Sequence, residues 1–223
     1  MVRHRPQGIR RRSFVIGLAG AGCMAPAQAQ DSTLRIPFTP GPAGLPAGFS
    51  IARTGKGAAA AWTAIADPDV PGGYVLAQTS TDPTDDRFPL AIYDPVTAVN
   101  LAVTVRLKAV AGRVDRAGGL AIRLADAGNY YVVRANALED NVRFYRVLKG
   151  RREQLEGANL KVTPNEWHRL GFRAEGERFT VTFDGKPLFT ATDRTFAGPG
   201  KVALWTKADS VTRFDQIEIK PLP

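Results

Sequence analysis

The sequence predicts an all-β protein whose strands form a two-sheet antiparallel jelly-roll sandwich. The clearest segment is Gly118–Leu148, where three runs of alternating apolar and polar residues are separated by two clusters of turn-forming residues. Beyond the first 29 residues, no segment shows a sustained apolar period of 3.6 residues, and turn signals recur at short intervals. These patterns are typical of a sandwich or barrel of short strands and disfavour a helical fold.

The first 29 residues have the features of an export signal. Three consecutive arginines precede a weakly apolar stretch, Val15–Ala25, and Ala27–Ala29 has the small-x-small form of a signal-peptidase site. The apolar stretch is shorter than the roughly 20 residues that a membrane-spanning helix requires. We therefore expect the mature chain to begin near Gln30 and to reside in the periplasm or outside the cell.

The route of export has three interpretations. Arg11 and Arg12, with Phe14 two positions further on, indicate the twin-arginine pathway. An ordinary Sec signal fits the same segment, and Cys23 offers a lipidation site as a third alternative. The sequence favours the twin-arginine route and leaves the other two open.

Charge and cysteine content narrow the partners of the mature chain. The formal charge of the whole sequence is +9, and the five arginines of the signal account for five of these charges, which leaves +4. This small excess does not predict a nucleic-acid partner, and after signal cleavage we expect no membrane attachment. Cys23 is the only cysteine, so the mature chain has neither a disulfide nor thiol chemistry. We expect a monomer.

The chain divides into three predicted parts. Residues 1–29 form the signal, and residues 30–50 form a lead-in rich in proline and glycine, with room only for a short edge strand such as Leu34–Ile36. Residues 51–223 form a single jelly-roll domain, which is long enough to bury a stable core without disulfides.

The first central hairpin has a predicted register. With Leu124 opposite Tyr131, Ile122 would face Val133 and Leu120 would face Ala135, which gives one apolar face of a sheet. An antiparallel sheet with one apolar face needs a second sheet to cover it, while its other face is free to meet a ligand.

Later segments supply further strands. Trp167–Arg173 and Phe179–Phe183 are expected to pair across an acidic turn, and Asp184-Gly185 is the strongest two-residue hairpin signal in the chain. The last two strands, Val202–Thr206 and Phe214–Ile219, are expected to pair and close the sheet.

The polar face of the central strands provides the candidate binding residues. Arginine offers a fork of donors to hydroxyl or carboxylate groups, and an aromatic ring offers a flat apolar surface with a polar tip. These properties suit a sugar or glycan, although a solvated outer face is the alternative interpretation. The predicted carbohydrate-binding residues are Arg123, Tyr130, Arg134, Asn136, Trp205 and Lys207.

Several kinds of catalytic site are disfavoured. His168 is the only histidine after the signal, so a serine triad or a histidine-rich metal site cannot be built, and His168 itself is expected at the edge of the core. Glycoside hydrolysis needs two carboxyl groups across a cleft, whereas Glu139 and Asp140 lie at a predicted hairpin tip, where acidic residues are common. The sequence identifies no catalytic residue.

A family resemblance rests on three segments: Gly119–Arg123, Asn129–Asn136 and Asn141–Val147. Together they resemble the bacterial secreted concanavalin-like jelly rolls of the 3-keto-disaccharide hydrolase family, which includes 3-keto-glucoside lyases and is similar to glycoside hydrolase family 16 and LamG domains. The resemblance implies a jelly roll and an activity on 3-keto-glycosides. Members of the family that look catalytic carry Asn-Ser-Gly before a strand that contains an arginine, and a Glu-x-Gln run ending in Asp on the next strand. In this sequence only the strand arginine, Arg123, is present. The sequence therefore favours an exported carbohydrate-binding protein with weak or no catalysis. The alternatives are a hydrolase or lyase of 3-keto-glycosides and a structural or protein-interaction module.

The sequence predicts no cofactor, with a structural calcium as the one possibility. Jelly rolls of this general type often hold calcium where the first and last strands meet, and Asp215 places a carboxylate on the last strand. Because Asp215 alternates onto the same face as Ile217, its charge must be paired, hydrogen-bonded or bound to a metal. The alternative partners are an arginine such as Arg213 or backbone amides of the lead-in segment.

Overall fold

The computed structural model describes residues 1–2 and 32–223, so residues 3–29 of the predicted signal, together with its processing site, lie outside the described residues. Residues 32–223 form one compact unit. They contain no α-helix and only one 3₁₀ turn, η1 (Pro42–Gly44). No helix in this part of the chain is long and apolar enough to cross a membrane.

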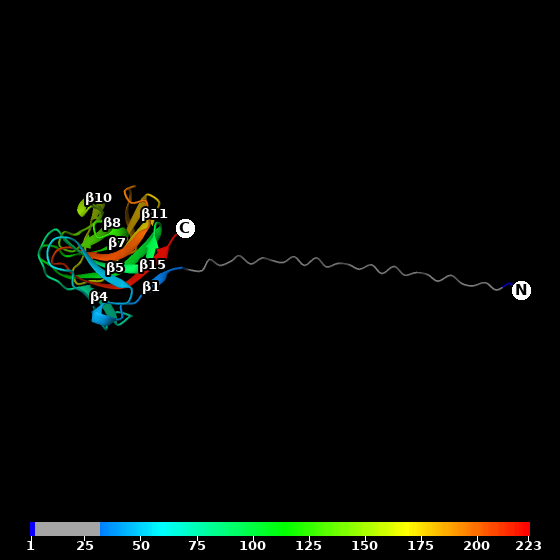
Figure 1. The fold of residues 1–223 in the computed structure, drawn as a ribbon, viewed down its shortest axis with the longest axis horizontal. Helices are drawn as coiled ribbons and strands as arrows, with labels where there is room; N and C mark the ends of the chain where they lie inside the picture. The colour runs from blue at the N-terminus through cyan, green and yellow to red at the C-terminus, as the bar shows by residue number, and fades with distance from the viewer. Residues whose placement is uncertain (3–31) are drawn as a thin grey trace. The chain divides into compact units, whose positions relative to one another are not determined.

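Two antiparallel sheets make up the domain, which confirms the predicted two-sheet jelly roll (Figure 1). The eight-stranded sheet consists, in spatial order, of β13 (Lys186–Thr192), β12 (Arg178–Phe183), β11 (His168–Glu175), β6 (Leu101–Ala111), β15 (Val211–Pro221), β4 (Tyr74–Gln78) and β3 (Trp62–Ala66), with β1 (Leu34–Ile36) also paired to β15. The seven-stranded sheet consists of β10 (Arg151–Asn159), β9 (Asn141–Leu148), β8 (Asn129–Asn136), β7 (Ala117–Asp126), β14 (Gly200–Thr206), β5 (Arg87–Ala98) and β2 (Phe49–Gly55).

The main core lies between the sheets because alternate side chains of both sheets point inward. Val103 and Phe172 of one sheet and Leu120 and Phe144 of the other belong to the same buried cluster. A second, smaller buried cluster lies on the opposite face of the seven-stranded sheet and includes Trp205. This second face carries most of the predicted binding residues, and we call it the outer face.

The central hairpin forms between β7 and β8, but its predicted register is wrong by two residues. Ile122 pairs with Tyr131 and Leu120 pairs with Val133. A β-bulge between Ile122 and Asp126 absorbs the difference. Since side chains alternate with a period of two, a shift of two residues leaves Leu120 and Ile122 on the apolar inner face, as predicted. The prediction is wrong for Leu124, which lies in the bulge and belongs to the buried cluster of the outer face.

The two later hairpins confirm the sequence prediction. Leu170 pairs with Phe183 and Phe172 with Val181 between β11 and β12. Asp184 and Gly185 connect β12 to β13, both with positive φ, which a two-residue turn of this kind requires.

The expectation for the last two strands is wrong. β14 pairs with β5 and β7 in the seven-stranded sheet, whereas β15 pairs with β4, β6 and β1 in the other sheet. The chain therefore crosses between the sheets after Thr206. Figure 1 shows β15, in red, beside β1, as their pairing requires.

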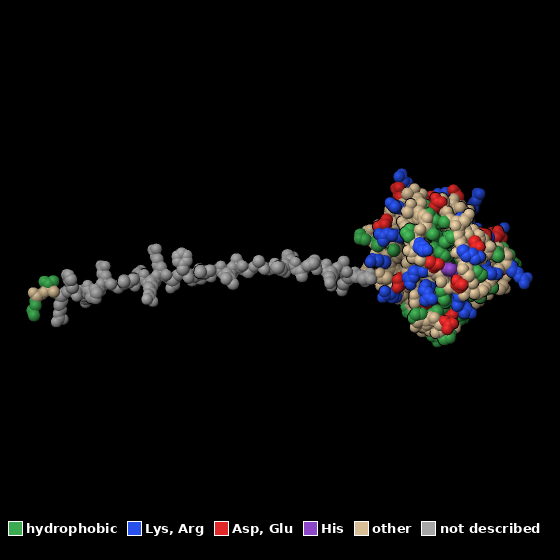
Figure 2. Space-filling view, turned by 180° about the vertical axis from the view of Figure 1, so that it is seen from behind, with side chains coloured by type: hydrophobic (Ala, Val, Ile, Leu, Met, Phe, Trp, Pro, Cys, Tyr) green, Lys and Arg blue, Asp and Glu red, His purple; other side chains and the backbone are tan. Residues whose placement is uncertain are grey.

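The surface carries both signs of charge. On the face shown in Figure 2, Lys and Arg side chains are interspersed with Asp and Glu side chains. Several ion pairs account for this mixture on the eight-stranded sheet, among them Arg173 with Glu175 and Arg169 with Glu218.

Candidate functional site

Aromatic side chains form the centre of the outer face. The rings of Phe88 and Trp205 stack with centroids 5.4 Å apart, and both belong to the second buried cluster together with Tyr145. The guanidinium of Arg152, from edge strand β10, lies 4.4 Å from the Tyr145 ring, 5.0 Å from Phe88 and 5.8 Å from Trp205. Arg152 therefore covers the aromatic rings through cation–π contacts.

Tyr130 lies beneath this layer. Its hydroxyl accepts a hydrogen bond from Trp205 Nε1 at 3.2 Å and is hydrogen-bonded to Thr54 Oγ1 at 2.8 Å. Burial raises the pKa of Tyr130 to about 12, so its hydroxyl stays neutral. Tyr130 and Trp205 thus form a buried hydrogen-bonded pair that fixes the orientation of the indole ring.

A polar cluster adjoins the aromatic rings, centred on Arg134 of β8. Arg134 donates hydrogen bonds from Nη1 to Asn141 Oδ1 at 2.6 Å and from Nη2 to Glu139 Oε2 at 2.9 Å and the Tyr145 hydroxyl at 3.1 Å. Burial acts to raise the pKa of Glu139, but Asn141 and Arg134 outweigh it and the pKa is lowered. Glu139 is therefore ionised and half-exposed beside a guanidinium, an amide and a phenol.

Lys207 organises the end of the outer face nearest Asn136. Its ammonium lies 2.5 Å from Asp85 Oδ1 and 3.1 Å from Asp115 Oδ2, and Asn136 donates to Asp115 Oδ1 at 2.9 Å. Complete burial raises the pKa of Asp115, although Lys207 and Arg134 oppose the shift. The pKa of Lys207 is also raised, because its two carboxylate partners outweigh its own burial.

Five of the six predicted binding residues lie on the outer face as expected: Tyr130, Arg134, Asn136, Trp205 and Lys207. Their predicted exposure is wrong, since Lys207, the most exposed of the six, retains only 8% of its accessible surface. The reason is that the large side chains of the outer face pack on one another. Whether these residues bind sugar stays a prediction.

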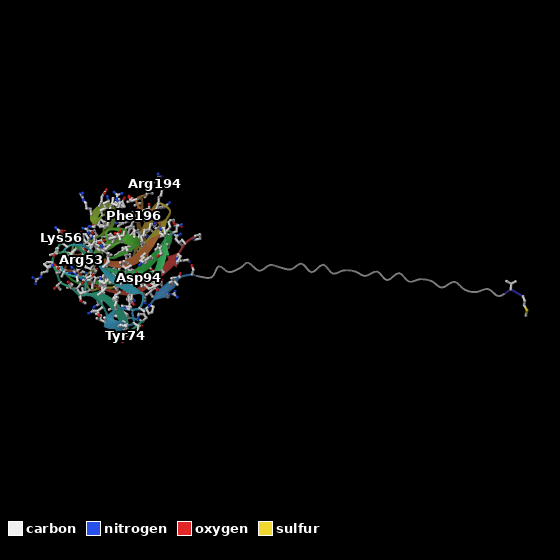
Figure 3. The ribbon with its side chains drawn as sticks, in the orientation of Figure 1. Arg53, Lys56, Tyr74, Asp94, Arg194 and Phe196 are labelled. Carbon is white, nitrogen blue, oxygen red and sulfur yellow. The ribbon has the colours of Figure 1, made fainter. Side chains whose placement is uncertain are left out.

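Arg123 is the exception, because it points away from the outer face. The bulge gives it a positive φ of 48°, and its guanidinium lies 5.2 Å from the ring of Phe179 in the main core. It donates to the carbonyl oxygens of Val99 at 2.9 Å, Phe196 at 2.8 Å and Gly176 at 2.5 Å. Phe196 is labelled in Figure 3, close to Arg194. Arg123 thus joins three loops at one end of the sandwich.

Four further residues of the outer face were not predicted from the sequence: Asn141, Arg143, Tyr145 and Arg152. Strand alternation could have found the first three, since these odd-numbered residues of β9 pair with Asn136, Arg134 and Val132 of β8. No local signal places Arg152, which reaches the aromatic rings from the edge strand.

Asp215 is buried and paired with an arginine, although not with the one predicted. Arg106 Nη1 donates to Asp215 Oδ2 at 3.0 Å, whereas Arg213 pairs with Asp67 at 3.2 Å. Burial raises the pKa of Asp215, although Arg106 acts to lower it. A cavity of about 430 Å³ opens beside Asp215 at β1 and β15.

These surroundings do not fit the possible structural calcium. The nearby carboxylate of Asp67 is held by its own arginine, and a hard cation needs about six oxygen ligands. No group of three His, Cys, Asp or Glu side chains in the described part of the chain could hold a metal ion. Calcium binding stays a prediction for experiment.

His168 occupies the edge of the core, as predicted. Its Nδ1 is hydrogen-bonded to Asp184 Oδ2 at 2.8 Å and its Nε2 to the Thr163 carbonyl oxygen at 3.1 Å, and the ring stacks on Phe183. Both ring nitrogens have partners, so the role of His168 here is to hold the β11–β12 hairpin.

A known protein family matches the C-terminal part of this chain. The profile of the C-terminal lectin domain of galactocerebrosidase matches residues 97–222, a range that includes β6 to β15. The chain belongs to this lectin-domain family. No curated protein matches it in sequence. The resemblance to the 3-keto-disaccharide hydrolase family stays a prediction.

Solved structures share the fold of this lectin-domain protein. Carbohydrate-binding module CBM66 from Bacillus subtilis is 20% identical with a TM-score of 0.60, and the match covers 78% of this chain and 95% of that one. A β-glucanase from Bacillus licheniformis is 15% identical with a TM-score of 0.56, covering 87% and 100%. A protein of unknown function from Shewanella oneidensis is 16% identical with a TM-score of 0.53, covering 91% and 96%. At these identities the similarity establishes the concanavalin-like jelly-roll fold.

Proposed function

We propose that the mature protein is an exported carbohydrate-binding jelly roll with weak or no catalysis, and that the sugar binds on the outer face around Tyr145. The observation that carries this proposal is the cluster of Arg134, Glu139, Asn141 and the Tyr145 hydroxyl. These groups supply donors and acceptors, in fixed orientations, of the kinds that sugar hydroxyls require. Membership of the lectin-domain family and the fold shared with a carbohydrate-binding module support the proposal.

A glycan panel tests this proposal, with binding measured by calorimetry and by retardation in polysaccharide gels. Asn141→Ala and Glu139→Gln are expected to weaken binding about tenfold, since each removes a hydrogen bond that involves a charged group. Glu175→Gln is the matched control, because Glu175 pairs with Arg173 on the other sheet. Failure of the wild-type protein to bind any saccharide would reject the proposal and favour a structural or protein-interaction module.

Hydrolysis or lysis of 3-keto-glycosides is the second candidate. One observation favours it: the pKa of Asp115 is raised and that of Glu139 is lowered, as in a pair of carboxyl groups with different catalytic roles. Asp115, however, is completely buried and paired with Lys207, which keeps it from a substrate. We expect no turnover of a 3-keto-glycoside panel. Turnover that is lost in Glu139→Gln and Asp140→Asn would establish the enzyme instead.

Export is part of the proposal and has its own test. The arginine run, the apolar stretch and the small-x-small site support cleavage near Gln30. N-terminal sequencing of the protein from a periplasmic fraction is expected to begin there. A cytoplasmic product that retains Met1 would exclude export.

A further inference from the structure

The outer face presents arginine side chains to solvent rather than aromatic rings. Trp205 is completely buried, and Phe88 and Tyr145 retain 5% and 7% of their surface. The guanidinium of Arg152 covers the three rings, while Arg152 itself stays partly exposed. A neutral sugar stacked on an aromatic ring would first have to displace Arg152. The group that meets a ligand here is therefore a cation.

Two arginines of this face lack a compensating charge. Glu139 pairs with Arg134, and Asp85 and Asp115 pair with Lys207. Among the described residues, no carboxylate pairs with Arg143 or Arg152. Arg152 Nη1 is also buried without a hydrogen-bond partner from the described protein groups. An unsatisfied buried donor on a charged group is costly, and an anionic acceptor would remove that cost.

Arg143 is held in place on the same face. It lies directly opposite Arg134 in the β8–β9 pair, although like charges in this position repel each other. Its Nη2 donates to Asn159 Oδ1 at 2.5 Å. A Cβ atom on Gly157 would lie 2.4 Å from Arg143 Cδ, so the glycine leaves room for the arginine stem on the edge strand. The guanidinium of Arg143 is therefore held in a fixed position despite its repulsion with Arg134.

The uncompensated arginines lie along one line of the face. Arg152 pairs with Val147 in register, four residues from Arg143 on β9, with Tyr145 between them. Four residues of a strand span roughly 13 Å along the backbone, and the two arginines come from separate strands, β9 and β10. This spacing fits a chain that carries repeated negative charges.

We propose, resting on the proposed function, that the ligand is an acidic saccharide whose carboxylate or sulfate groups bind Arg152 and Arg143. A guanidinium presents two parallel N–H donors that match the two oxygens of such groups. Arg134 and Tyr145 then contact the hydroxyl groups of the sugar between the charges.

The test compares matched polymers. Dextran and dextran sulfate differ only in sulfate groups, so their comparison measures the effect of sulfate. Polygalacturonate carries carboxylates instead, so its binding measures the effect of carboxylate. We expect the acidic polymers to bind at least about tenfold more tightly than dextran, and their binding to weaken as NaCl is raised.

Variants locate the binding on this face. Arg152→Gln and Arg143→Gln are expected to weaken binding of the acidic polymers about tenfold each, and Arg152→Lys less, since lysine keeps the charge but loses the planar fork. Arg151→Gln is the matched control, because Arg151 is the exposed neighbour of Arg152 on the same strand and alternates to the other face. Melting curves confirm that each variant is folded.

The outcomes distinguish the two proposals. Equal binding of dextran and dextran sulfate, unchanged in Arg152→Gln, would overturn the acidic ligand and leave sugar binding intact. No binding to any saccharide would overturn both. Binding of single-stranded DNA as tight as that of the acidic saccharides, and equally sensitive to Arg152→Gln, would show a general polyanion site and also overturn the inference.

Discussion

Asp209 illustrates how one carboxylate holds a loop in this protein. It accepts hydrogen bonds from the backbone N–H groups of Arg113 at 2.7 Å, Asp115 at 3.0 Å and Val114 at 3.1 Å. Burial acts to raise the pKa of Asp209, but these backbone donors outweigh it and the pKa is lowered. The Asp209 carboxylate therefore holds three consecutive residues of the loop that carries Asp115 toward Lys207.

We predict that Asp209→Ala lowers the free energy of unfolding by about 2 kcal/mol at neutral pH, because it leaves three backbone donors, that of Asp115 buried, without this acceptor. A carboxylate with a lowered folded-state pKa stabilises the protein above its unfolded pKa of 3.8, and this contribution is lost as the pH falls through the folded-state value. The difference in the free energy of unfolding between Asp209→Ala and the wild type should therefore become smaller in acid. Urea unfolding across this pH range measures it, with the exposed Asp69→Ala as control. A difference independent of pH would contradict the role of the charge.

Asp215 behaves in the opposite sense, because its folded-state pKa is raised. The contribution of Asp215 to the free energy of unfolding is fully present below its ordinary pKa of 3.8. This contribution is lost as the pH rises through its folded-state pKa. We predict that Asp215→Asn gains stability relative to the wild type as the pH rises from below 3.8 to neutral. Since Arg106 partners the carboxylate, EDTA should leave the melting temperature of the wild type unchanged. A large fall on adding EDTA, absent in Asp215→Asn, would establish the calcium site.

At the scale of elements, Arg123 connects three loops through the carbonyl oxygens of Val99, Gly176 and Phe196. We predict that Arg123→Ala lowers the free energy of unfolding by at least about 3 kcal/mol, since the buried guanidinium is lost from three carbonyl acceptors of separate loops. Arg194→Ala should change it by less than about 0.5 kcal/mol, because the ion pair of Arg194 with Glu177 is exposed. Thermal or urea unfolding compares the two variants. Loss of sugar binding in Arg123→Ala at unchanged stability would restore the binding role predicted from sequence.

The contact between β14 and the bulge of β7 leaves no space for a side chain. A Cβ atom on Gly200 would lie 2.2 Å from the carbonyl carbon of Arg123 and 2.5 Å from the backbone nitrogen of Leu124. Gly200→Ala is therefore expected to cost about 1–3 kcal/mol through displacement of the two strands. Gly198→Ala provides the control, because no atom lies within 4 Å of its added Cβ. Equal unfolding midpoints for the two variants would show that the strands can separate without cost.

At the scale of the whole molecule, we predict a monomer. The exposed large apolar side chains are scattered over different elements, and edge strand β10 exposes charged residues such as Arg151 and Glu153. Mixed charges on the face in Figure 2 agree with this. We predict that light scattering after size-exclusion chromatography gives the mass of one mature chain. A stable dimer would indicate that a strand edge is shared between copies.

The sequence by itself determined the all-β class, the hairpins and the inner face of the central strands, because side-chain alternation and turn chemistry are local properties of the backbone. It also placed Tyr130, Arg134 and Trp205 on a common face by the same alternation. Only the tertiary structure decided the bulge at Arg123, the separation of β14 and β15 into two sheets, and the burial of Trp205 beneath Arg152. Each of these depends on which distant strands become neighbours, and strand pairing over long separations leaves no mark on the local pattern of residues.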